Sequence, residues 1–388
     1  IPFTAEVEQK VAEPLRFEYS LEASNFAPKM IRDVATSPDG RLVVFHAVGK
    51  LWTRTLPNGK PQRLTQQADD FEYEPSFSPD GRKLLYTRWN DAELVRIVER
   101  DLASGSERVL PTGQGYFYAP HFAPNGQDIV YAKTSGSELT GRVWSKDPGI
   151  YLLRGGADSA ERIAKGGNSP QFNADGSRVL YFTGGFSNKE SGKKLMSVGL
   201  HGEEPRQVFS MKYPTQVSLS PDGKWVAFTE LFNAYVAPVP ATGGSVELAK
   251  DGKAFPVAKI SADAGSYLHW SDNDSLHWTV GSEYFSRDLD QVFAFLPGAP
   301  KTLPKPSEAK GIQLGLSHPV YVSNDRVALA GGRIITMRDA ENTQEVIEDG
   351  IVLVSGDSIV AVGPRNEVRV PDGTRVIDVS GKTIYPGI

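Results

Sequence analysis

Short apolar runs of four to six residues alternate with polar turns through the first three hundred residues. Five turns are alike and lie at residues 37–40, 78–81, 123–126, 173–176 and 220–223, and a degenerate sixth reads Ser-Asp-Asn-Asp at 271–274. The turn glycines Gly40, Gly81, Gly126, Gly176 and Gly223 are 41, 45, 50 and 47 residues apart. A repeat of this length is typical of propeller blades or helical solenoids.

Each repeat carries four β-like runs, one before the turn and three after it, and shows no helical period. In the first repeat we expect the runs at residues 31–36, 42–47, 51–56 and 62–65. In the sixth repeat we expect them at 267–270, 276–280, 292–296 and 301–303, and the fourth run of the fifth repeat at 246–249. Six such units predict an all-β protein with a six-bladed β-propeller of four-stranded blades.

Aromatic residues fall at equivalent places in the second run of every repeat. They are Phe45, Tyr86, Tyr131, Tyr181, Phe228 and Trp278. A single blade cannot bury both of its apolar faces, so blades stack radially and each covers its neighbour. We therefore expect these six side chains to form the layer between blades, where each contributes about a few kcal/mol by burial of its area.

The repeated pattern, clearest as FSPDGRKLLY at residues 77–86, resembles the propeller repeats of the TolB family. The resemblance covers residues 31–304. Similar repeats occur in the propellers of tricorn-type and prolyl-oligopeptidase-type peptidases. The resemblance therefore specifies a fold and leaves the function open.

The last sixty residues form a second pattern of short β-rich runs separated by Asp-Gly, Gly-Asp and Ser-Gly turns. The runs lie at residues 327–337, 351–354, 359–362, 376–379 and 382–385. They predict a small antiparallel sheet with tight hairpins. Such a sheet has too little surface for a core of its own and needs a partner. The alternative interpretation is a free β-sandwich or an extra propeller segment.

This tail resembles the N-terminal strands of the amidohydrolase superfamily. The matching pieces come in order: Gly-Arg-Ile in the 331–334 region, Ile-Glu-Asp-Gly at 347–350, Asp-Ser-Ile-Val-Ala-Val-Gly at 357–363, Val-Ile-Asp at 376–378, Gly-Lys-Thr at 381–383 and Pro-Gly-Ile at 386–388. The resemblance implies a partial β-sandwich that leads into a (β/α)8 barrel. In that family Pro-Gly-Ile is typically followed by Asp-x-His-x-His, which holds the first metal ligands. On this basis we expect the sequence to be a fragment that ends just before a metal-binding barrel.

These patterns divide the chain into three predicted parts. Residues 1–30 either close the ring with a strand or belong to a preceding domain. Residues 31–308 form the propeller, and residues 309–388 form the partial β-sandwich before the absent barrel. The resemblance implies that the barrel binds one or two divalent metal ions, commonly zinc, whereas the 388 residues themselves carry no predicted cofactor.

Composition excludes several classes of protein. Hydrophobic residues make up 39% and charged residues 23%, and the net charge is −5. No basic patch for nucleic acid is evident, and no run approaches the roughly 18 apolar residues of a membrane span. The absence of cysteine excludes disulfides, thiolate metal ligands and a cysteine nucleophile. It fits a periplasmic or secreted protein and leaves a cytoplasmic one open.

Few residues stand out as chemical groups. Asp39, Asp80, Asp175 and Asp222 precede glycine, where a carboxylate stabilises a turn. The acidic run 271–275 lacks the glycine and the distant glutamate of a calcium loop. His269 and His277 flank that run on adjacent strands and are weak candidates for metal ligands. The other histidines are isolated, and neither a nucleophile elbow nor a phosphate loop is present. No catalytic residue is predicted.

Three functional hypotheses remain. The first is the non-catalytic N-terminal portion of a metal-dependent amidohydrolase that hydrolyses C–N bonds. Its propeller would gate or orient a small-molecule or peptide substrate, and its tail would contact the missing catalytic domain or a homo-oligomer partner. The alternative is a TolB-like propeller that binds protein partners without catalysis. The third is the propeller of a peptidase, which the tail disfavours.

Overall fold

The computed structural model describes residues 24–134, 146–186, 191–240, 244–321, 323–338 and 345–387. The chain divides into two compact units. One consists of Ala27–Ser317, and the other combines Ile1–Phe26 with His318–Ile388.

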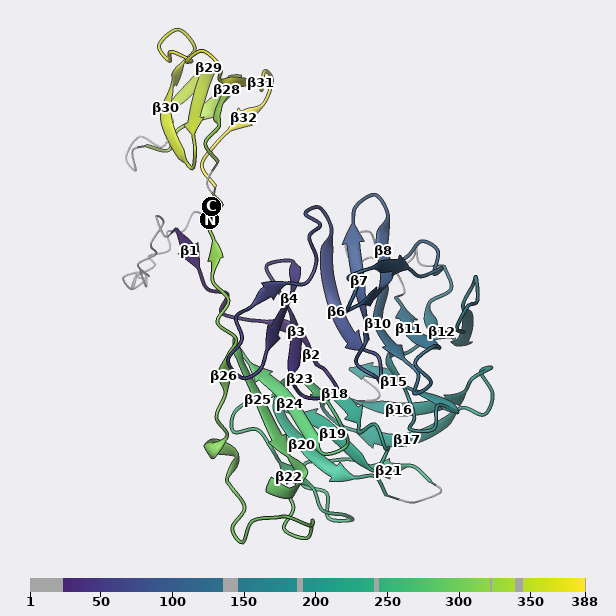
Figure 1. Cartoon of the computed structure of the whole chain (residues 1–388). Coiled ribbons are helices and arrows are strands. Elements are labelled where there is room, and N and C mark those ends of the chain that lie inside the picture. Colours follow the sequence, from purple (N-terminus) through teal and green to yellow (C-terminus); the bar gives the residue numbers. More distant parts are fainter. Residues whose placement is uncertain are drawn as a thin grey trace, which may run out of the picture. The chain divides into compact units, whose positions relative to one another are not determined.

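The larger unit is a ring of six antiparallel sheets, here called blades 1 to 6 (Figure 1). Blade 1 contains β2 (Arg32–Thr36), β3 (Leu42–Ala47), β4 (Lys50–Thr55) and β5 (Gln62–Arg63). Blade 2 contains β6 (Phe71–Phe77), β7 (Lys83–Asn90), β8 (Leu94–Asp101) and β9 (Glu107–Val109). Blade 3 contains β10 (Phe117–Phe122), β11 (Ile129–Lys133), β12 (Gly149–Leu153) and β13 (Glu161–Ala164).

The remaining three blades repeat this order. Blade 4 contains β14 (Asn168–Phe172), β15 (Arg178–Phe186), β16 (Ser191–Gly199) and β17 (Arg206–Met211), with β21 (Val246–Glu247) added in parallel at the edge. Blade 5 contains β18 (Pro214–Leu219), β19 (Trp225–Glu230), β20 (Asn233–Pro238) and β22 (Ala258–Lys259). Blade 6 contains β23 (Ser266–Trp270), β24 (Ser275–Val280), β25 (Glu283–Asp288) and β26 (Ile312–Gln313), with the short helices η2 (Leu289–Gln291) and η3 (Pro306–Glu308) between the last two.

Apolar packing between neighbouring blades makes the core. One cluster joins Val44, Leu51 and Leu64 of blade 1 to Tyr86 and Val98 of blade 2. All six second-strand aromatics predicted to lie between blades are buried, which confirms that prediction. The predicted fold class, an all-β propeller of four-stranded blades followed by a small sheet, is confirmed as well.

The ring closes between blade 1 and blade 6 without a shared strand, because each of these two blades is built from one continuous stretch of chain. The first strands β2 and β23 lie next to each other. The backbone N–H of Ile31 donates to the carbonyl of Gly281 at 3.1 Å. Apolar residues of both blades, among them Phe45 and Tyr284, share one buried cluster. Side-chain contacts at this seam therefore hold the ring together.

Three strand predictions in the last two blades were wrong. In blade 6 the third strand is β25 and the fourth is β26, not 292–296 and 301–303. Gly281, at φ +62°, allows a tight turn directly after β24, so the chain pairs at once and Val292 and Phe293 pack into the core from an irregular segment. In blade 5 the fourth strand is β22, because the predicted strand at 246–249 forms β21 on blade 4.

The predicted domain limits also differ from the observed units. Residues 309–317 belong with the propeller, because β26 pairs with β25 through Glu283–Gln313 and Tyr284–Ile312. Of the predicted N-terminal segment 1–30, residues 1–23 lie outside the described residues. β1 (Asn25–Phe26) pairs with β27 (His318–Pro319) in the smaller unit, so it adds no strand to a blade.

The smaller unit contains one five-stranded sheet. Its strands are β28 (Arg326–Ile335), β29 (Val346–Ser355), β30 (Ser358–Pro364), β31 (Arg375–Asp378) and β32 (Thr383–Ile384). β28, β29 and β30 form the predicted antiparallel hairpins. β31 and β32 both pair in parallel with β28, which corrects the prediction of an antiparallel sheet throughout.

One face of this sheet has a small core, whereas other apolar side chains stay exposed. Ala328, Ala330, Ile351 and Leu353 are buried and pack against two valines of the connection after β30. The side chains of Ile359, Val360 and Val376 are 66%, 55% and 59% exposed. Ile359 and Val360 lie on β30 and Val376 lies on β31, at opposite edges of the sheet.

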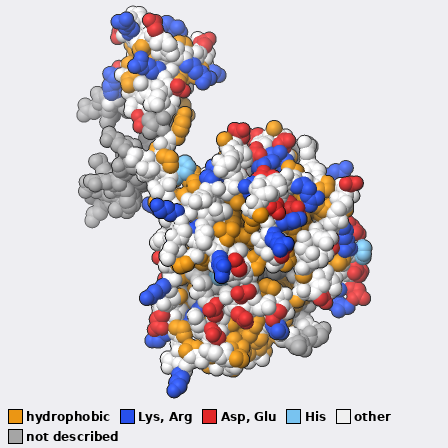
Figure 2. All heavy atoms as spheres, in the orientation of Figure 1, with side chains coloured by type: hydrophobic (Ala, Val, Ile, Leu, Met, Phe, Trp, Pro, Cys, Tyr) orange, Lys and Arg blue, Asp and Glu red, His pale blue; other side chains and the backbone are white. Residues whose placement is uncertain are grey.

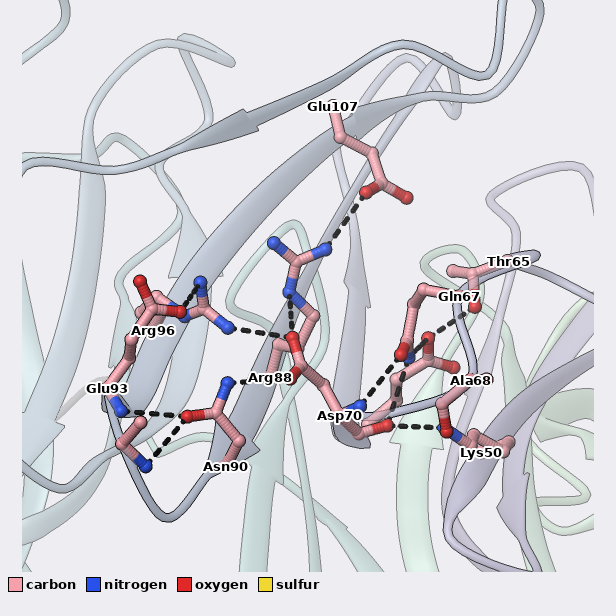
Figure 3. A network of polar contacts seen from close by, with 12 residues as sticks. Lys50, Thr65, Gln67, Ala68, Asp70, Arg88, Asn90, Glu93, Arg96 and Glu107 are labelled. Carbon is pink, nitrogen blue, oxygen red and sulfur yellow. Dashed lines mark hydrogen bonds and ion pairs between the residues drawn. The ribbon is translucent and has the colours of Figure 1, made fainter.

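A polar network fills the junction between blades 1 and 2 (Figure 3). Asp70 forms ion pairs with Arg88 at 3.0 Å and Arg96 at 2.7 Å. Gln67 accepts the backbone N–H of Asp70 at 2.8 Å and donates back to its carbonyl at 3.0 Å. The carboxylate of Glu72, which is fully buried, accepts the N–H of Leu51 at 2.9 Å and hydrogen bonds from the side chains of Thr65 and Gln67. The network fixes the connection from β5 to β6.

The surface shows no patch of one charge sign on the face in view (Figure 2). Lys and Arg side chains are interspersed there with Asp and Glu side chains. Within the described ranges, no helix has the length and apolar character needed to cross a membrane.

Candidate functional site

The first strands of the six blades surround a cavity of about 670 Å³ in the middle of the propeller. This volume lies in the range of small-molecule sites. Residues from all six first strands line it, together with the prolines of four of the turns, Pro38, Pro79, Pro124 and Pro221. We refer to this space as the channel cavity.

Six of the lining residues occupy one equivalent position, four residues before the start of each turn. They are Asp33, Glu74, Ala119, Ser169, Gln216 and Tyr267. All but Gln216 have positive φ angles, between 46° and 54°. Such angles are uncommon for residues other than glycine. The pairing register of each first strand shifts near this position, so these residues belong to β-bulges.

Two of these six residues, Asp33 and Glu74, are carboxylic acids on the neighbouring strands β2 and β6. Oε2 of Glu74 accepts the backbone N–H of Ala119 on blade 3 at 2.9 Å. Burial raises the pKa of Glu74 to about 8, and the negative charge of Asp33 adds to this shift. Burial also raises the pKa of Asp33. Ionisable groups with shifted pKa values in a cavity are typical of binding and catalytic sites.

His46 on β3 lies beside this acid pair. Its Nδ1 is 3.8 Å from Oδ2 of Asp33, too far for a hydrogen bond, and its ring packs on Tyr73 with centroids 4.8 Å apart. Both ring nitrogens are buried and lack a hydrogen-bond partner. Burial, assisted by the charge of Arg32, lowers the pKa of His46 to about 4. The imidazole is therefore neutral at pH 7.

The two histidines predicted as weak metal candidates, His269 and His277, are direct cross-strand partners with ring centroids 5.3 Å apart. Each of their four ring nitrogens has a hydrogen-bond partner. Nδ1 of His269 lies 2.6 Å from the carbonyl of Tyr267, and its Nε2 lies 2.7 Å from Oγ1 of Thr36. Nδ1 of His277 lies 2.7 Å from the hydroxyl of Tyr284, and its Nε2 lies 2.8 Å from Oγ of Ser271.

These hydrogen bonds form a continuous series that ends at the carbonyl of Tyr267, and this end fixes the direction of every bond in the series. The carbonyl of Tyr267 can only accept, so Nδ1 of His269 donates. Burial lowers the pKa of His269 to about 4, so its other nitrogen is bare and accepts from Thr36. Thr36 has one proton and must accept from Tyr284, at 2.8 Å. Tyr284 in turn accepts from Nδ1 of His277.

The remaining donor is Ser271, whose hydroxyl donates a hydrogen bond to Nε2 of His277. The chain thus runs one way from Ser271 to the carbonyl of Tyr267 and crosses the seam between blades 6 and 1 at Thr36. Within the described part of the chain, no three His, Cys, Asp or Glu residues are placed to hold a metal ion. The hydrogen bonds give both imidazoles a structural role at the seam, and metal binding by them stays a prediction.

We expect Tyr284→Phe to destabilise the propeller. The variant removes the hydroxyl that joins His277 to Thr36 and leaves a buried N–H without an acceptor, which costs about 1–3 kcal/mol. Urea unfolding followed by tryptophan fluorescence measures the change. Phe285, the next residue, stacks on Trp278, so the emission spectrum of the folded variant shows whether packing at the seam is retained. A variant as stable as the wild type would contradict the assigned chain.

The turn aspartates have the predicted local role. Asp39, Asp80 and Asp222 accept a hydrogen bond from the first serine of their turn, at 2.5, 2.6 and 2.7 Å, and Asp175 accepts one from Ser177 at 2.6 Å. These bonds lower the pKa of Asp39, Asp80 and Asp175. In the acidic run after Trp270, Asp272 accepts the N–H groups of Asp274 and Ser275, as in an ordinary turn.

No family model matches the chain. Among solved structures it is similar to the tricorn protease, with 14% identity and a TM-score of 0.54 over 91% of this chain and 32% of that one. The propeller fold is shared. TolB from Acinetobacter baumannii is also similar, with 18% identity and a TM-score of 0.44 over 60% of this chain and 55% of that protein.

One curated protein matches a short stretch of the sequence. It is a 5-methylthioadenosine/S-adenosylhomocysteine deaminase of Symbiobacterium thermophilum, 38% identical over 64 residues. The match covers 16% of this chain and 14% of the deaminase. The chain thus spans a small part of that relative, about a third of the tricorn protease and about half of TolB. The similarity to the tricorn protease shows the fold alone.

Proposed function

We propose that this chain is the non-catalytic part of a metal-dependent amidohydrolase acting on C–N bonds, in which the propeller admits or orients the substrate. The observation that carries the proposal is the ordered series of sequence blocks in the smaller unit, the first four of which fall in order on β28, β29, β30 and β31 of one sheet. The 64-residue similarity to a deaminase supports it.

The chemistry would belong to a metal centre outside the described residues. A bound divalent metal lowers the pKa of its water to about 7 and polarises the scissile group. The residues described here supply no ligand set for such an ion. Their part in the proposal is to bind and orient the substrate in or near the channel cavity, whose width at the first strands limits what enters.

The natural gene product tests this proposal directly. We expect the codons after Ile388 to encode Asp-x-His-x-His, and the purified full-length protein to contain about one or two equivalents of zinc by mass spectrometry. Ammonia release from amino-purine nucleosides and from linear and cyclic amides would then be assayed, with chelator-treated enzyme as the control. A gene that stops at Ile388, or a metal-free protein with unchanged activity, would overturn the proposal.

A protein-binding module without catalysis is the second candidate, and the propeller fold, which by itself leaves the function open, is compatible with it. The two candidates differ in one simple outcome. A natural chain that ends at Ile388 and binds a peptide tightly would support the binding module.

A further inference from the structure

The channel cavity carries acidic groups without basic ones. Its lining includes the carboxyl groups of Asp33, Glu74 and Asp272, and none of the described lining residues is Lys or Arg. Of the two histidines in the lining, His269 has its pKa lowered to about 4 by burial and is neutral at pH 7, whereas His121 is exposed to solvent. A cavity lined by one sign of charge with low-dielectric walls concentrates ligands of the opposite sign.

Asp33 and Glu74 are arranged as a pair. They hold the same position in adjacent blades, and the negative charge of Asp33 adds to the rise that burial causes in the pKa of Glu74. Like charges held together are relieved when a cation lies between them. Buried His46, next to Asp33, has two nitrogens without a hydrogen-bond partner. His46 itself is not one of the residues that line the cavity.

We propose that the channel cavity binds a ligand through an ammonium or guanidinium group held between Asp33 and Glu74. Tyr267, at the equivalent position of blade 6, lines the same cavity. The cation belongs either to a small amine or to a basic peptide residue. The inference concerns the propeller alone and stands whether or not the parent protein is a hydrolase.

Binding of such a group is coupled to proton release. Glu74, with a pKa of about 8, is largely protonated in the free protein at pH 7. A bound cation favours the carboxylate and lowers that pKa, so affinity rises with pH between about 6.5 and 8.5. The titratable and charged groups around Glu74 are Asp33 and Arg32 on β2, His46 on β3, Tyr118 and His121 on β10, and Tyr267 on β23. Of these, Arg32 is exposed and outside the lining.

Isothermal titration calorimetry with three short probes tests the proposal. Acetyl-Gly-Lys-Gly-amide presents a side-chain ammonium, Gly-Gly-Gly-amide presents a terminal one, and acetyl-Gly-norleucine-Gly-amide is the neutral match. We expect at least one cationic probe to bind about tenfold or more tightly than the neutral one. Titration in two buffers with different ionisation enthalpies should reveal release of up to about one proton per ligand. Which cationic probe binds tells a side chain or small amine from a peptide terminus.

Matched variants separate the site from the general charge of the protein. Asp33→Asn and Glu74→Gln keep an oxygen that accepts the neighbouring N–H, and each should weaken cation binding about tenfold. Glu74→Gln should also abolish the proton release. Asp80→Asn, in the same blade but outside the cavity, should change affinity by less than about twofold. Melting temperatures confirm that each variant is folded. Equal affinity for the neutral probe, no saturation by any cationic probe up to about 10 mM, or unchanged binding by both cavity variants would overturn the proposal.

Discussion

Acidification from pH 6.5 to pH 4.5 should destabilise the propeller, and so should a rise from pH 6.5 to pH 8. The acid limb comes from histidines that are buried in neutral form. The folded-state pKa is about 4 for His46 and His269 and lies well below 6.5 for His277, whereas the unfolded value is 6.5 for each. Between these values the unfolded chain binds more protons than the folded one, so stability falls as the pH falls.

The alkaline limb comes from Glu74, whose pKa is about 8 in the folded state and 4.5 when unfolded. Here the folded protein binds the extra proton, so stability falls as the pH rises toward 8. Between pH 6.5 and pH 4, His46 and His269 each lower the free energy of unfolding by about 3 kcal/mol. Over the same range Glu74 raises it by about 3 kcal/mol. The net loss is roughly 3 kcal/mol, which His277 increases. The turn aspartates act only below about pH 4, because hydrogen bonds lower their pKa from 3.8.

Urea midpoints measured at intervals from pH 4.5 to pH 8.5 give this profile, with a maximum near pH 6.5. Two variants assign its limbs. In Glu74→Gln the urea midpoint should no longer fall between pH 6.5 and pH 8, and its fall below pH 6.5 should remain. In His46→Leu the fall below pH 6.5 should be smaller by the contribution of one imidazole. A midpoint that is constant from pH 4.5 to pH 6.5 would contradict the assignment of neutral buried histidines.

The variant Glu72→Gln should destabilise the propeller by about 2–4 kcal/mol, because a buried donor loses its acceptor. Glu72 receives three hydrogen bonds, from the N–H of Leu51 on one oxygen and from Thr65 and Gln67 on the other. A glutamine has one oxygen, so its NH₂ group must face at least one of these donors. Gln67 cannot reverse its amide without losing both bonds to the backbone of Asp70.

Denaturant unfolding of Glu72→Gln beside Glu93→Gln checks this expectation. Glu93 pairs with Arg96 at the edge of the same network, and its side chain is 57% exposed. Loss of that exposed pair should cost less than about 1 kcal/mol. If the two variants unfold at the same denaturant concentration, Glu72 does not hold the junction in the way its contacts indicate.

The strands beside the repeated turns could be predicted from the sequence better than the strands far from them. Each turn sets the two strands beside it by local hydrogen bonds, so strands such as β7 and β19 were placed correctly from the pattern alone. The pairing of a strand far from a turn depends on which sheet has a free edge beside it. Val246 could continue blade 5 or join blade 4, and only the packed neighbour decides between them.

The candidate site was harder to predict, for the same reason. Asp33 and Glu74 are 41 residues apart and match no motif; they meet because β2 and β6 become neighbours in the ring. A repeat alignment that compares the residue four before each turn would have singled them out. His269 and His277 were correctly placed as neighbours in a hairpin. Their hydrogen-bond partner Thr36, 233 residues from His269, belongs to the other end of the ring.

The way the ring closes has a consequence for how such a protein changes over time. No strand is shared between the first and last blades, and blades 1, 2, 3 and 6 each correspond to one uninterrupted segment of the gene, unlike blade 4, whose edge strand β21 comes from the segment of blade 5. Duplication or deletion of one such segment leaves each remaining sheet complete and alters only the two contacts at the join. The number of blades is thus free to vary by recombination, and the polar chain through Thr36 is what a changed ring would have to rebuild.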